Sequence, residues 1–92
     1  MRLNDKEIIA IRSVVKEFDP KAEIKLFGSR IDDNKKGGDI DLLIISNIIN
    51  FSEKLSILIK LKENIGDQKI DILIYDPNKT FHNIAYKEGV TL

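Results

Sequence analysis

The sequence contains no cysteine, carries no net charge and has no long apolar run. Without cysteine the chain can build neither a disulfide framework nor thiol chemistry, which fits a reducing compartment. Its 15 basic side chains balance 15 acidic ones, so we do not expect direct nucleic-acid binding. No stretch approaches the roughly 18 apolar residues of a membrane-spanning helix, and the first ten residues lack the apolar core of a signal peptide. We expect a cytoplasmic protein with no membrane contact.

The length of 92 residues suits one small domain, which we expect to span residues 1–92. A domain of this size is marginally stable unless it packs well or has a partner. Spare apolar surface on so thin a domain favours assembly, either as a homo-oligomer or with another protein.

Two helices are predicted from capping boxes followed by apolar residues at helical spacing. The first begins after Asn4 and ends near Asp19-Pro20, and the second begins after Asn50 and ends at Gly66. The second helix has apolar residues on more than one stripe, so the pattern does not decide which stripe is buried. We expect burial of Leu55, Leu58 and Ile59 and leave Ile57 and Leu61 undecided.

Three strands are predicted at residues 23–27, 40–46 and 69–75. The second is apolar on both faces, which favours a central position in a sheet. A final helix follows the turn at Asp76-Pro77, with Asn78 or Thr80 as its cap. We expect His82, the only histidine, to be a surface residue on that helix.

The stretch from Lys25 to Ile45 holds the candidate site. Gly28 and Ser29 follow a strand, where glycine permits an unusual backbone turn and the first turn of a helix attracts anions. Asp39 and Asp41 open the next strand and point to one side of it, with Cα atoms roughly 6.5 to 7 Å apart. Magnesium prefers one or two carboxylates together with phosphates and water. The stretch therefore offers a phosphate-binding site at Gly28 and Ser29 and a cation-binding site at Asp39 and Asp41.

Each of these residues also has a simpler interpretation. Asp39 and Asp41 alone could be a polar strand start, and Asp71 could be a strand-edge charge that answers Lys69. Arg30 could reach triphosphate oxygens or form a surface ion pair. The other charges between Arg30 and Gly38 are typical of a solvated loop.

Taken together, Gly28-Ser29, nine intervening residues, Asp39-x-Asp41 and a later Asp71 in an apolar strand resemble the signature of the DNA polymerase β-like nucleotidyltransferase superfamily. The short length is similar to that of its minimal nucleotidyltransferase branch. In that branch ten residues commonly separate Gly-Ser from the first aspartate. The resemblance implies an α+β fold, with three to four strands in a small mixed sheet and the element order α-β-α-β-α-β-α.

The resemblance also implies the chemistry. Asp39, Asp41 and Asp71 would be the catalytic residues and would hold two Mg²⁺ ions, with Asp71 as the best candidate to accept a proton from the acceptor. Gly28, Ser29 and Arg30 would bind the nucleotide. The branch usually pairs with a helical protein of the HEPN class, so the expected reaction is transfer of AMP from ATP to that partner, as the antitoxin of a type VII toxin–antitoxin pair.

Two alternatives remain open at this stage. The chain could be a non-catalytic antitoxin that binds and occludes a HEPN partner. It could instead be a nucleotidyltransferase that acts on a small-molecule acceptor.

Overall fold

The computed structural model describes residues 2–32 and 38–92. Its elements, in chain order, are α1 (Asp5–Phe18), β1 (Glu23–Phe27), the 3₁₀ helix η1 (Gly28–Ile31), β2 (Ile40–Ile45), α2 (Phe51–Ile65), β3 (Ile70–Ile74), α3 (Thr80–Glu88) and β4 (Val90–Thr91). The predicted α+β class and element order are confirmed, and β4 is an addition. The predicted connection from Arg30 to Gly38 is described only at its two ends.

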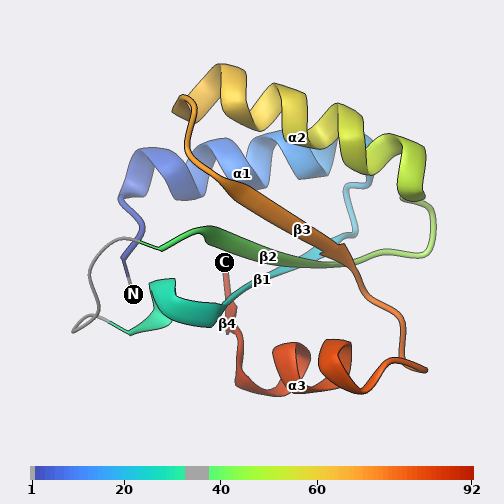
Figure 1. The fold of residues 1–92 in the computed structure, drawn as a ribbon. Helices are drawn as coiled ribbons and strands as arrows, with labels where there is room; N and C mark the ends of the chain where they lie inside the picture. Colours follow the sequence, from blue (N-terminus) through green and yellow to red (C-terminus); the bar gives the residue numbers. More distant parts are fainter. Residues whose placement is uncertain (1, 33–37) are drawn as a thin grey trace.

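The four strands form one mixed sheet in the order β3-β2-β1-β4. β2 runs parallel to β3 and antiparallel to β1, so β2 lies inside the sheet as predicted and β3 lies at an edge. Helices α1 and α2 cover one face of the sheet, and α3 lies against the other (Figure 1). No helix in the described part of the chain is long and apolar enough to cross a membrane.

The main core lies between the sheet and the layer of α1 and α2. Its members on these helices and on three strands are Ile11, Val14, Val15, Ile24, Leu26, Ile40, Leu42, Ile44, Ile57, Leu61, Ile70 and Ile72. Leu42 and Ile44 belong to this core, so Asp41 and Leu43, which alternate with them, point to the side of α3. The acidic residues of β2 and β3 therefore share a face with the smaller helix.

The buried stripe of α2 differs from the predicted one. Ile57 and Leu61 are fully buried, whereas Leu55 is 59% and Ile59 is 51% exposed. Leu58 is half-buried at the margin of the core. The prediction of burial is therefore wrong for Leu55 and Ile59, because the helix packs through the neighbouring apolar stripe.

Both predicted capping boxes are present. The Asn4 side chain accepts from the backbone N–H of Glu7 at 2.8 Å, and Glu7 accepts from the N–H of Asn4 at 3.0 Å. Asn50 and Glu53 exchange the same two bonds at 3.1 Å each. Gly66 ends α2 with a positive φ of 88°, as its position predicts.

The start of α3 departs from the prediction. Lys79, and neither Asn78 nor Thr80, is the N-cap, and no side chain caps the helix there. His82 is buried, and its Nδ1 accepts a hydrogen bond from the Asp76 backbone N–H at 3.0 Å. The expected surface position of His82 is wrong, because this side chain fixes the turn that leads from β3 into α3.

Candidate functional site

Two carboxylates meet across the parallel pairing of β2 and β3. The register places Asp41 directly opposite Asp71, and neighbouring strands lie about 4.8 Å apart. The strand that carries Asp71 therefore runs beside the strand that carries Asp41. The two side chains come from segments 30 residues apart in sequence and lie on the face that α3 covers in part.

The pKa of Asp41 is raised above its ordinary value. Burial contributes most, followed by the negative charges of Asp71 and Asp39 and by a hydrogen bond with Asp71 that favours the protonated form, while Lys69 opposes these effects. An ionised Asp41 is therefore costly in this position. A proton or a bound cation would offset that cost.

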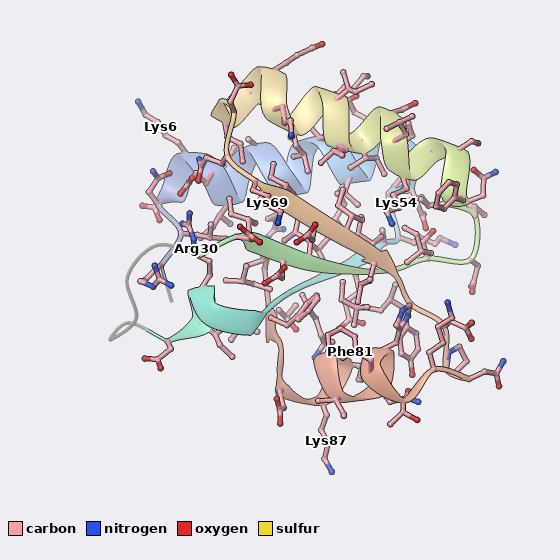
Figure 2. All side chains as sticks on the ribbon, viewed as in Figure 1. Lys6, Arg30, Lys54, Lys69, Phe81 and Lys87 are labelled. Carbon is pink, nitrogen blue, oxygen red and sulfur yellow. The ribbon has the colours of Figure 1, made fainter. Side chains whose placement is uncertain are left out.

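Asp39 lies immediately before β2 and forms an ion pair with Lys69, at 3.4 Å between Oδ2 and Nζ. The backbone supports this pairing, because the N–H of Ile40 donates to the carbonyl of Lys69 at 3.0 Å. Lys69 thus forms its ion pair with Asp39. The simpler interpretation of Asp71 had paired Lys69 with Asp71 instead. Figure 2 shows Lys69 beside the sheet.

Two of the three carboxylates expected to bind magnesium lie next to each other here. In the described ranges, no three Asp, Glu, His or Cys side chains are gathered closely enough to hold a metal ion. Asp41 and Asp71 still supply two adjacent carboxylates, which is what Mg²⁺ uses when phosphates and water complete its shell. The pair fits an ion that binds together with a nucleotide, and a site built from all three acids stays a prediction.

Gly28 is required by its surroundings as well as by its backbone. It follows β1 with a φ of +75°, which residues with a Cβ rarely adopt. A Cβ placed there would lie 3.2 Å from Asp41 Cγ and closer still to Asp41 Oδ2. The absence of a side chain at Gly28 therefore makes room for the Asp41 carboxylate. Ser29 lies in the 3₁₀ helix that begins at Gly28, and its predicted contact with phosphate stays a prediction.

Arg30 braces the chain around the site. Its guanidinium donates to the carbonyl of Arg2 at 2.7 Å, to the carbonyl of Gly38 at 3.3 Å and to Gln68 Oε1 at 3.1 Å. Gln68 in turn donates to Glu7 Oε2 at 2.6 Å. Gly38 precedes Asp39, and Gln68 precedes Lys69, so Arg30 ties together the entries to the two acid-bearing strands. Its predicted contact with the nucleotide stays a prediction, and these bonds take the place of the surface ion pair.

Two hollows flank Asp41, and both are lined by Phe27, Asp41 and Phe81. The first, which we call the glycine hollow, has a volume of about 410 Å³ and adds Gly28, Ile31, Ile84, Ala85 and Glu88. The second, the aspartate hollow, has a volume of about 520 Å³ and adds Asp71, Leu73 and residues of α2 such as Lys54 and Leu58. Asp41 is thus open to two compartments that differ in lining.

Sequence reasoning missed two residues at the site. Lys69 carries a signal in the sequence, because it precedes Asp71 by two positions and therefore falls on the same side of the strand. Phe81 lies on α3 toward the sheet (Figure 2) and could not have been assigned to the site from its spacing. Only the packing of α3 brings Phe81 beside Asp41.

Comparison with known protein families places the chain in one of them. A family model described as "Nucleotidyltransferase domain" matches residues 8–91, a span that begins within α1 and includes every later element through β4. A comparison with curated proteins finds no match. The matched span contains all six residues that the sequence predicts for the site.

Proposed function

The chain belongs to the nucleotidyltransferase domain family, and we propose that it transfers AMP from ATP, with Mg²⁺, to a hydroxyl group of a HEPN-class partner protein. In this role it would act in the cytoplasm as the antitoxin of a type VII toxin–antitoxin pair. The observation that carries the catalytic part is the pairing of Asp41 with Asp71 beside the turn at Gly28.

The proposed reaction is an in-line displacement at the α-phosphorus of ATP. The acceptor oxygen forms a bond to that phosphorus, the bond to the oxygen that bridges to the β-phosphate breaks, and pyrophosphate leaves. Asp71 is exposed at the edge strand and takes the proton of the acceptor hydroxyl. Two Mg²⁺ ions held by Asp41 and Asp71, with Asp39 as the third proposed ligand, would neutralise charge on the phosphates.

The chain's own contribution is position. Gly28 lets the backbone turn close to Asp41, so phosphates bound at Gly28 and Ser29 would lie next to the carboxylate pair. Lys69 adds a positive charge next to Asp39 and opposes the rise in the pKa of Asp41. Arg30 holds the entries to β2 and β3 in place.

The proposed protein partner is supported by exposed apolar side chains on α2. Phe51 is 80%, Leu55 59% and Ile59 51% exposed, and all three come from one helix. Clustered apolar exposure of this kind is typical of surfaces that contact another protein. The HEPN identity of the partner and the choice of ATP rest on the resemblance of the motifs.

A non-catalytic antitoxin is the second candidate. It is favoured by the lack of a gathered three-acid cluster among the described residues, together with the same apolar residues of α2. In that case the chain would silence its partner by covering it, and the aspartates would be idle.

The test is incubation of the chain with its candidate HEPN partner, Mg²⁺ and each of the four NTPs, followed by intact-protein mass spectrometry. We expect the partner's mass to increase by one adenylyl group, which is AMP less one water, with ATP only. Asp39→Asn combined with Asp41→Asn should abolish the adduct, and the matched surface variant Glu63→Gln on α2 should retain it.

Equal adduct formation by the wild type and the double aspartate variant would overturn the catalytic proposal. If the double variant forms no adduct but still binds and silences the partner, occlusion is the function. An adduct on a soluble small molecule without any partner protein would point to the small-molecule alternative.

A further inference from the structure

Phe81 is an exposed aromatic ring that borders a charged site. It is 60% exposed, although it lies in the first turn of α3 and makes a T-shaped contact with Phe27, with ring centroids 6.0 Å apart and planes at 77°. Phe27 pairs across the sheet with Asp41. The contact holds the Phe81 ring beside the carboxylate and leaves much of its surface to solvent.

Single exposed apolar residues are common and need no explanation on their own. Phe81 differs from Phe51, the other strongly exposed phenylalanine, because Phe81 lines both hollows that contain Asp41. Phe51 lies at the start of α2 and lines neither. The chain thus offers a strongly exposed phenylalanine at the site and a matched exposed phenylalanine away from it.

The two hollows differ in what they can bind. The glycine hollow contains the turn where the triphosphate is proposed to bind, and apolar side chains of Ile31, Ile84 and Ala85 line it together with the Phe27 and Phe81 rings. Its acidic side chains are Asp41 and Glu88. The aspartate hollow contains Asp71, the proposed proton acceptor, and opens along the edge strand toward α2. The first therefore suits the donor nucleotide, and the second suits the acceptor.

We propose that Phe81 is the platform on which the nucleobase of the donor nucleotide stacks, within the glycine hollow. This inference rests on the proposed function, since it takes the nucleotide's phosphates to lie at Gly28. A volume of about 410 Å³ is in the range of small-molecule pockets, and Ala85 adds only a methyl group to the lining. Every base has a π-face, so stacking on an aromatic ring does not depend on which base is bound. Phe81 would therefore add affinity for the nucleobase without selecting one base over another.

The chain contains no tryptophan, so Phe81→Trp creates a single fluorescent reporter at the proposed platform. We expect ATP with Mg²⁺ to quench this fluorescence in a saturable manner and inorganic tripolyphosphate to leave it nearly unchanged. Phe51→Trp, the matched reporter on α2, should respond to neither. Equal responses of the two reporters to ATP, or no response at position 81 when calorimetry shows that ATP binds, would overturn the proposal.

Removal of the ring gives a second, independent readout. Loss of one stacked base weakens binding by roughly five- to 150-fold, so Phe81→Ala should raise the Kd for ATP by a factor in that range. The Kd for tripolyphosphate should stay the same, and Phe51→Ala should change neither. A parallel loss of affinity for both ligands would mean that the ring supports the fold or the phosphate site and would refute a base platform.

The failure of this inference differs from failure of the proposed function. A chain that binds ATP through Phe81 and forms no adduct on any acceptor would retain the base platform and lose the transferase proposal. A chain that transfers AMP with the same KM for ATP in the wild type and in Phe81→Ala would retain the transferase and lose the platform.

Discussion

Replacement of Gly28 by alanine should destabilise the fold for two separable reasons. The backbone φ of +75° costs a residue with a Cβ about 1–2 kcal/mol. The new Cβ would also displace the Asp41 carboxylate, because it would lie 3.2 Å from Cγ and nearer to Oδ2. The first cost belongs to Gly28 alone, and the second depends on Asp41.

The second cost can be worked out from the contacts of Asp41. To give way, its carboxylate must leave its rotamer, at about 0.5–1.5 kcal/mol. At a pH at which Asp41 is protonated, where the cycle is to be measured, it must also give up the hydrogen bond with Asp71, at a further cost of about 0.5–1.5 kcal/mol. We therefore expect Gly28→Ala to lower the free energy of unfolding by about 2–5 kcal/mol in the wild type. In the Asp41→Ala background only the backbone cost of about 1–2 kcal/mol should remain.

The assay is a double-mutant cycle measured by urea denaturation, with circular dichroism as the probe. The expected coupling between positions 28 and 41 is about 1–3 kcal/mol. If Gly28→Ala costs the same with and without the Asp41 carboxylate, the close approach of the turn to this side chain is refuted. A cost well below 1 kcal/mol in both backgrounds would refute the backbone argument as well.

Three further predictions concern charge, core and capping. Burial, Asp71 and Asp39 raise the pKa of Asp41 in the folded state, so its ionised form reduces stability at pH 7, and this loss disappears as the pH falls through the raised pKa toward the ordinary value of about 3.9. Asp41→Asn should therefore have a higher Tm than the wild type at pH 7 in metal-free buffer. A difference in Tm that does not become smaller at pH 4 would contradict this. Leu61→Ala should cost about 2–5 kcal/mol in urea denaturation, whereas the exposed Leu55→Ala should stay within about 0.5 kcal/mol of the wild type; similar losses would mean that the two stripes of α2 are wrongly assigned. Asn50→Ala should cost about 1 kcal/mol by removing the cap of α2, and no loss of α2 protection in hydrogen exchange would count against the capping box.

Local patterns in the sequence were sufficient for most elements. The side chains of Asn4 and Asn50 accept hydrogen bonds from the backbone N–H three residues ahead, within reach of each side chain, so their capping boxes form as predicted. The apolar stretch of β2 requires cover on both faces, and the strand lies inside the sheet. These signals depend on neighbours in sequence and are therefore readable without the fold.

The errors arise where packing chooses between equivalent local options. Helix α2 has apolar residues on two stripes, so nothing local decides that Ile57 is buried and Ile59 exposed. β4 contains only Val90 and Thr91 and exists because β1 offers it hydrogen bonds. His82 is buried because the turn at Asp76 needs an acceptor. The first two outcomes are set by elements distant in sequence, and the third by a backbone N–H six residues away whose need for an acceptor appears only in the folded turn.

The candidate site divides in the same way. Asp41, Asp71 and Gly28 could be found from the sequence because acids and glycine in and beside apolar strands are conspicuous. The ion pair of Asp39 with Lys69 and the bracing bonds of Arg30 required the relative placement of the two strand entries. Phe81 required the position of α3 on the sheet.

The ladder between β2 and β3 has a consequence for the length of the connection before Asp39. The register of the two paired strands, in which Ile40 lies opposite Ile70, places Asp41 opposite Asp71. This register does not depend on the number of residues between Ser29 and Asp39, which is nine here against a common ten. Insertion or deletion of one residue in that connection would therefore leave Asp41 opposite Asp71. One residue inserted between Ile70 and Asp71 would set a different side chain opposite Asp41 and turn the rest of the strand over.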